Sequence, residues 1–162
     1  MKLKKDSHQK NIGINGNFMY LPHIHKKLNS IIHTHESRDP FKIAKDKRIF
    51  ILEEELGEIF GYYNRIKRIQ FIHINTSLSE DLKLFVCSHE LGHCICHSNE
   101  NTPQLSSMSI TSEMKVEKEA NYFATNLIID GRHKELQLPT KYEILDYYGL
   151  PWYLDRYIYS RI

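Results

Sequence analysis

The spacing of hydrophobic residues changes twice along the chain. In the first part, residues 22–35 and 39–48 place apolar side chains three or four positions apart, which predicts two helices. Asp39 and Pro40 suit the cap and the first turn of the second helix. The next three segments are short and rich in β-branched and aromatic residues, so they read as strands. They predict a small three-stranded antiparallel sheet at residues 48–53, 58–63 and 68–75, with a hairpin turn at 64–67.

Helical spacing returns after the predicted sheet. Residues 79–97 and 112–130 predict two longer helices, the first of them capped by Ser79. A polar loop at 98–111 separates them, and residues 140–160 predict a final pair of short helices. Helices followed by strands and then by more helices are typical of an α+β fold.

The length of 162 residues predicts a single domain. Residues 1–18 are mostly polar and are predicted to form a flexible N-terminal arm, which leaves 19–162 as the domain. The composition is that of a globular protein, because 41% of the residues are hydrophobic and 26% are charged.

The net charge of +2 gives no strong field for nucleic acid or for a membrane surface, so neither is expected as a direct partner. No apolar run approaches the length of a membrane-spanning helix, and the basic start has no apolar segment behind it to form a secretory signal. The three cysteines, Cys87, Cys94 and Cys96, are clustered and odd in number, which favours packing in a reducing compartment over disulfides. These features together predict a cytoplasmic protein.

The segment "HELGH", residues 89–93, carries the most specific chemistry. On a helix His89 and His93 lie about 40° apart around the axis, one turn from each other, so both imidazoles can bind one zinc ion. Glu90 flanks them and can take a proton from metal-bound water as that water attacks a carbonyl. The alternative is a pair of core histidines, which accounts less well for two in register beside a glutamate.

A catalytic zinc usually has three protein ligands, so one more is expected. Glu113, Glu117 and Glu119 all lie on or near the apolar face of the following helix, and periodicity does not choose among them. His97 lies about 12 Å along the axis from His89, too far for both to bind one ion on an unbroken helix. Cys96 could pair with His93 on a metal, although a buried thiol is the simpler interpretation.

"HELGHCICH" followed by "VEKEANYFATNLI" resembles the ImmA/IrrE metallopeptidases, and the likeness extends over roughly residues 22–160. The resemblance implies a zincin-like fold. It also implies zinc ligands His89, His93 and Glu119, with Glu90 as the catalytic base. Manganese remains an alternative to zinc, because affinity order does not decide which ion is bound in a cell.

The resemblance further implies an anti-repressor: an endopeptidase that cuts a helix-turn-helix repressor of a phage or mobile element. The strand at 68–74 is the expected open edge for an extended substrate. Tyr122, His73 and His97 are candidates for stabilising the oxyanion, with Tyr122 as easily an exposed surface residue. The competing hypothesis is a regulator that binds zinc and the repressor without cutting it.

Overall fold

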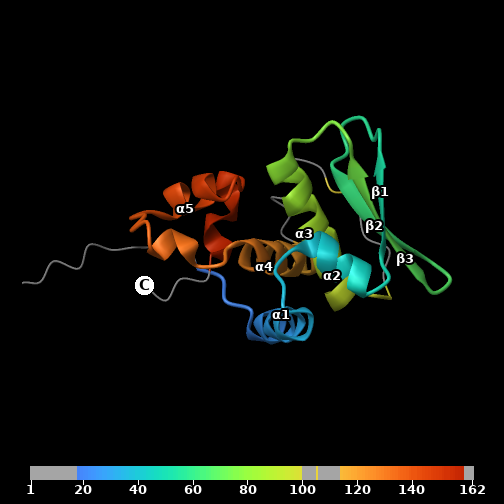
Figure 1. Cartoon of the computed structure of the whole chain (residues 1–162), viewed down its shortest axis with the longest axis horizontal. Helices are drawn as coiled ribbons and strands as arrows, with labels where there is room; N and C mark the ends of the chain where they lie inside the picture. The colour runs from blue at the N-terminus through green and yellow to red at the C-terminus, as the bar shows by residue number, and fades with distance from the viewer. Residues whose placement is uncertain (1–17, 100–104, 106–113, 159–162) are drawn as a thin grey trace, which may run out of the picture.

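A computed structural model describes residues 18–99, 105 and 114–158 of the chain (Figure 1). Nearly all of the predicted N-terminal arm, and most of the predicted loop at 98–111, lie outside the described residues. The elements are α1 (Pro22–His35), α2 (Pro40–Asp46), β1 (Phe50–Glu54), β2 (Gly61–Ile66), β3 (Ile69–Asn75), α3 (Glu80–Cys96), α4 (Lys115–Ile128), η2 (Arg132–Lys134), α5 (Lys141–Tyr147) and η3 (Trp152–Tyr157). This order confirms the α+β prediction.

The helices begin where the sequence predicts caps. The Asp39 carboxylate accepts a hydrogen bond from the Phe41 amide at 2.9 Å, and Pro40 is the first residue of α2. Ser79 caps α3 by accepting from the Leu82 amide at 3.4 Å. These contacts are local, so neighbouring residues determine them.

The sheet is mixed, and the prediction of three antiparallel strands is wrong for β1. The strand order is β1-β3-β2; β3 pairs antiparallel with β2 but parallel with β1, with Phe50 opposite Phe71. The link from β1 to β2 spans two strand spacings, about 10 Å. This leaves room for β3 to pair between β1 and β2. The hairpin turn lies at residues 67–68, where Lys67 adopts a positive φ of 58°, and not at 64–67.

The central position of β3 also corrects the expectation that it forms an open edge. Both of its sides pair with other strands over most of its length. The edge strands are β1 and β2, and part of the β2 edge is already used. Leu105 exchanges two backbone hydrogen bonds of 2.8 Å there, one with Phe60 and one with Gly61.

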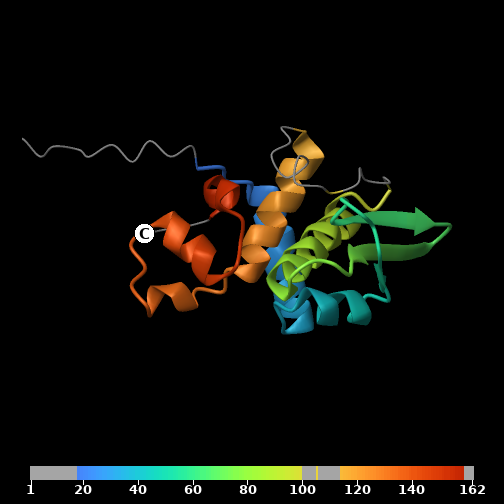
Figure 2. The same ribbon diagram turned by 90° about the horizontal axis from the view of Figure 1, so that it is seen from above.

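Helix α3 lies between the sheet and α4 and forms the centre of the molecule. Figures 1 and 2 show the sheet on one side of the α3–α4 pair and the C-terminal helices on the other. Close approach depends on two glycines. A Cβ on Gly61 would lie 2.5 Å from both the His73 carbonyl oxygen and Val86 Cγ1, and one on Gly92 would lie 3.2 Å from Phe123. A side chain at Gly92 would therefore push Phe123 of α4 away from α3.

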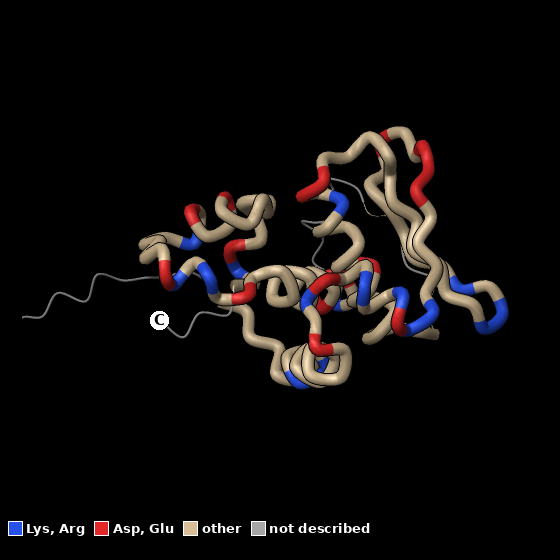
Figure 3. The backbone as a smooth tube through the Cα atoms, in the orientation of Figure 1, with Lys and Arg blue, Asp and Glu red and all other residues tan. Residues whose placement is uncertain are grey.

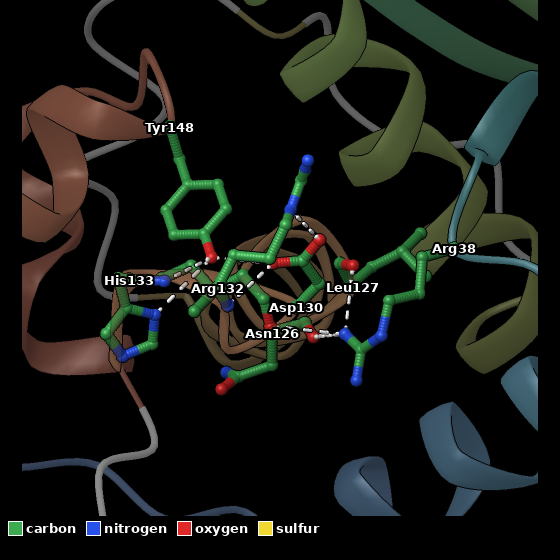
Figure 4. A network of polar contacts seen from close by, with 8 residues as sticks. Arg38, Asn126, Leu127, Asp130, Arg132, His133 and Tyr148 are labelled. Atoms are coloured by element: carbon green, nitrogen blue, oxygen red, sulfur yellow. Dashed lines mark hydrogen bonds and ion pairs between the residues drawn. The ribbon is translucent and has the colours of Figure 1, made fainter. Parts of the chain in front are cut away.

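The C-terminal end of α4 is held by side chains from distant parts of the chain (Figure 4). Arg38 Nη1 donates to the carbonyl oxygens of Asn126, Leu127 and Ile129 at 2.9, 3.1 and 3.2 Å. These carbonyls have few partners within the helix itself, so the guanidinium caps them. On the other side, the Tyr148 hydroxyl donates to Asp130 at 2.6 Å. This network fixes α4 against both the N-terminal and the C-terminal helices.

Within the described part of the chain, no helix is both long and apolar enough to cross a membrane.

Candidate metal centre

His89 and His93 project from α3 one turn apart, and both are buried, at 0% and 1% exposed. Their Nε2 atoms lie 3.1 Å from each other. The four-residue spacing predicted this arrangement, because it places both rings on one stripe of the helix. Two imidazole nitrogens so close together without an ion between them need one ring to donate to the other. An ion that both can bind relieves that constraint.

Glu117 of α4 completes the group. Its two carboxylate oxygens lie 3.4 Å from His89 Nε2 and 3.4 Å from His93 Nε2. In the described residues these three side chains form the one group whose ligand atoms all lie within 4.8 Å of one another. The close packing of α4 on α3 at Gly92 brings the carboxylate into reach.

The geometry fits a tetrahedral ion. A zinc ion with bonds of about 2.0–2.2 Å sets its donor atoms roughly 3.3–3.6 Å apart. The two imidazole nitrogens lie 3.1 Å apart, and each lies 3.4 Å from one oxygen of the Glu117 carboxylate, which is close to this range. Two imidazoles and one carboxylate leave the fourth position of a tetrahedral ion for water, the composition typical of a catalytic zinc.

Asn121 was not anticipated from the sequence, although it follows Glu117 by one helical turn. Its Oδ1 lies 3.0 Å from His89 Nδ1. An amide oxygen accepts only, so this contact keeps the proton on Nδ1 and leaves Nε2 with its lone pair towards the metal position. Asn121 thereby orients a candidate ligand, and the signal for it was its place one turn along the same helix face.

The structure differs from the expectation for Glu119, because it brings Glu117 to the two histidines instead. Residues two positions apart on a helix point about 200° apart, so the two carboxylates face different neighbours. The oxygens of Glu119 lie 2.9 Å from His23 Nε2 and 3.1 Å from His97 Nε2. Glu113, the other alternative, lies outside the described residues.

Without an ion, His89 is the exception among the three ligands: burial alone would lower its pKa, but its contact with Glu117 and the charge of Glu90 raise it, whereas Glu117 and His93 are already in the forms that bind a divalent cation. Burial alone would raise the pKa of Glu117, but hydrogen bonds from His89 and His93 lower it to about 2. Burial lowers the pKa of His93 to about 4. At neutral pH the carboxylate is therefore charged and the His93 imidazole is neutral, which are the forms that bind metal.

Glu90 lies beside this group and is fully buried. Neither of its oxygens has a hydrogen-bond partner at normal geometry among the described residues. Burial raises the pKa of Glu90 to about 8, and the nearby charge of Glu117 adds to the rise, while His89 and the Tyr63 backbone oppose it only in part. A fully buried carboxyl group with so little hydrogen bonding is costly unless it serves a ligand, an ion or water.

The three candidates for oxyanion stabilisation have other neighbours. Tyr122 is buried, contrary to its interpretation as an exposed surface residue, and its hydroxyl lies 3.0 Å from His25 Nδ1. His73 lies between the core residues Ile72 and Ile74 and therefore points to the opposite face of the sheet, where it contacts Glu54 at 2.6 Å. His97 lies near the candidate metal ligands, with its ring 5.7 Å from that of His93.

Comparison with the sequences of known proteins also indicates a metallopeptidase. The profile of the peptidase M78 family, described as the IrrE N-terminal-like domain, matches residues 44–154. The chain is 32% identical over 146 residues to the metallopeptidase ImmA of Bacillus subtilis, a match that covers 86% of this chain and 85% of ImmA. It is 36% identical over 103 residues to an uncharacterized immunity region protein 2 of Bacillus phage phi105, covering 63% of this chain and 65% of that protein. The chain therefore belongs to the peptidase M78 family and is a metallopeptidase.

Proposed function

We propose that this protein is a zinc-dependent endopeptidase of the cytoplasm that cuts a helix-turn-helix repressor at a specific site and so derepresses a phage or mobile element. Residues 19–162 act as one catalytic domain. The observation that supports this most strongly is the buried Glu90 beside the group of His89, His93 and Glu117.

In this proposal His89, His93 and Glu117 hold the ion, and Asn121 keeps the His89 imidazole in the tautomer that binds it. A bound ion would supply Lewis-acid chemistry at this position, which activates a water and the scissile carbonyl. Glu90 is the group placed to take up a proton there. Burial raises the pKa of its carboxyl, and the charge of a bound cation would lower it again, so that the carboxylate is available as the general base.

Zinc is the proposed ion. Imidazole ligands suit zinc better than they suit manganese, which prefers oxygen donors. Two nitrogen donors and one carboxylate at near-tetrahedral separations support this choice. Metal analysis of protein purified without added ions tests the assignment, and manganese is the alternative that it would reveal.

The proposed substrate rests on the character of the relatives. One of them is a phage immunity region protein and another is ImmA, a metallopeptidase. The net charge of +2 gives this chain little attraction for DNA, so a partner repressor supplies the DNA-binding domain.

A regulator that binds zinc without cutting is less well supported. Structural zinc sites are usually closed by four protein ligands. The described residues contribute three, and the buried Glu90 would have no role in such a site.

The experiment is to incubate the purified protein with the repressor encoded nearest to its gene and to follow the repressor on a gel. Wild type is expected to cut it at one bond, identified by mass spectrometry, and a chelator is expected to prevent the cut. Absence of cleavage, with zinc bound and the repressor copurifying, would replace the peptidase proposal with the non-catalytic regulator.

A further inference from the structure

A second candidate site lies away from the metal centre, at the end of the sheet where the parallel strands β1 and β3 begin. A groove of about 650 Å³ opens there between α2 and the β2–β3 hairpin. Its volume is in the range of sites that hold ligands in other proteins. The described residues that line it are Phe41, Lys45, Arg48, Ile49, Phe50, Ile51, Arg68 and Ile69.

The lining combines an apolar floor with a cationic rim. Phe50 and Ile69, which both line the groove, are 54% and 49% exposed and so offer apolar surface to a ligand. Lys45, Arg48 and Arg68 supply the charge, and no acidic residue is among the lining residues that the structure describes. These three cations also take part in no ion pair recorded between described side chains.

Charged residues of the sheet are also separated by sign, with the basic ones at the end that carries the groove. Lys and Arg gather at the tip of the β2–β3 hairpin and at the nearby end of α2, whereas Asp and Glu mark the opposite end of the sheet (Figure 3). A ligand that enters the groove therefore meets positive charge over apolar surface. Such a surface is complementary to carboxylates attached to apolar groups.

The backbone at the groove can also take part. β3 begins at Ile69, but its pairing with β1 begins only at Phe71. Ile69 and Gln70 thus have β2 on one side and no strand residue on the other within the described chain. The backbone at this start of β3 can add a main-chain hydrogen bond to an extended peptide whose side chains enter the groove.

We infer that this groove is an exosite that binds an extended, acidic segment of a protein partner, in which Asp or Glu alternate with aromatic or aliphatic residues. The inference rests on the proposed function in one respect: the partner is taken to be the protein substrate. The exosite then selects the substrate by a segment remote from the bond that is cut, because none of its lining residues belongs to the metal centre. A nucleic acid matches the cationic rim but not the apolar floor, so it is the weaker fit.

Binding is tested with a fluorescein-labelled nonapeptide in which Asp and Glu alternate with Phe and Leu, by fluorescence polarisation on full-length Glu90→Gln. This variant keeps the groove unaltered and removes any cleavage of the probe. Two comparison peptides replace the acidic residues by Lys, or the apolar residues by Ser. The acidic apolar peptide is expected to bind, and each comparison peptide to bind about tenfold more weakly or worse.

Charge reversal locates the site. Lys45→Glu combined with Arg68→Glu is expected to weaken binding of the acidic probe about tenfold or more. Arg48 is left unchanged because its φ of 57° makes substitution harder to interpret. Lys26→Glu combined with Lys27→Glu is the matched control: both lysines are exposed on α1 and do not line the groove, so this variant should bind as before. Circular dichroism establishes that each variant is folded.

The exosite is overturned if the acidic probe fails to bind at about 1 mM, binds the charge-reversed variant equally well, or binds no better than the lysine peptide. Binding of a single-stranded DNA 20-mer that depends on the same two residues, without binding of the acidic probe, would overturn it in favour of nucleic acid. Repressor cleavage without probe binding would remove the exosite and leave the peptidase standing. Probe binding without repressor cleavage would leave the exosite standing and remove the proposal that the repressor is cut.

Discussion

Glu117 and Glu119 have the same side chain and are separated only by Lys118, yet they contact different parts of the molecule. Glu117 faces α3 and both histidines, with hydrogen bonds that lower its pKa to about 2. Glu119 faces α1 and the end of α3, where it joins His23 and His97. The helix geometry alone separates the two roles, since their directions differ by about 200°.

Glu117→Gln is accordingly expected to lose most of the bound zinc, while Glu119→Gln keeps it. The amide is neutral and a far weaker metal ligand than the carboxylate. Zinc per mole of protein, measured by mass spectrometry after dialysis, distinguishes the two variants. A metal-free Glu119→Gln beside a zinc-loaded Glu117→Gln would reverse the assignment.

The sequence predicted how three side chains of the candidate site lie relative to one another but not which carboxylate lies beside them, for reasons visible at single residues. His89, Glu90 and His93 lie on one helix, so their relation follows from the chain alone. The third ligand depends on how α4 rotates against α3, which the contact between Gly92 and Phe123 helps to decide. That contact joins residues far apart in sequence, and periodicity does not reveal it.

At the scale of elements, strands and helices were predicted with different success. The caps of α2 and α3 are local and were found at the predicted residues. The neighbours of β1 are set by long-range pairing with β3, which no turn signal indicates. Close packing then holds the layers together, and Gly61 is the tightest point between β2, β3 and α3.

Gly61→Ala is therefore expected to destabilise the protein by about 1–3 kcal/mol, a typical cost of overpacking. The new methyl group meets the His73 carbonyl oxygen, which belongs to the backbone and has little room to move. Urea denaturation of wild type and variant measures the difference in the free energy of unfolding. A variant as stable as wild type would mean that β2 sits less tightly on α3.

Tyr148→Phe tests the network that attaches α5 to the end of α4. Burial alone would raise the pKa of Asp130, but hydrogen bonds from Tyr148 and Arg132 outweigh it and lower the pKa. A lowered folded-state pKa contributes stability above the unfolded value, about 3.9, and loses it as pH falls through the folded value. Loss of the hydroxyl should cost about 0.5–1.5 kcal/mol at pH 7.

The difference in unfolding free energy between wild type and Tyr148→Phe should shrink as the pH falls from the unfolded value of about 3.9 through the lowered pKa of folded Asp130. Tyr147→Phe is the control, because that ring is 45% exposed. A difference that stays constant between pH 7 and pH 3 would mean that the Asp130 carboxylate is not the partner that matters.

At the scale of the whole molecule, the candidate metal centre lies between its two central helices. His89 and His93 belong to α3 and Glu117 to α4, and these helices carry the sheet on one side and the C-terminal helices on the other. An ion bound by both helices stabilises the folded state, by about 2.7 kcal/mol when the free metal is a hundred times its Kd.

Removal of the ion is thus expected to lower the melting temperature of wild type and to leave that of Glu117→Gln nearly unchanged. Thermal unfolding with and without a chelator, followed by circular dichroism, measures both. Equal shifts in the two proteins would indicate that the chelator acts elsewhere than at this group.

The most direct measurement compares wild type with Glu90→Gln, each analysed for zinc and then incubated with the repressor encoded nearest to the gene. Our account predicts that both bind one zinc ion, that wild type cuts the repressor, and that Glu90→Gln is slower by about 10²–10⁴-fold, the usual contribution of a general base. Equal cleavage by the two zinc-loaded proteins would contradict the role of Glu90 and with it the proposed mechanism.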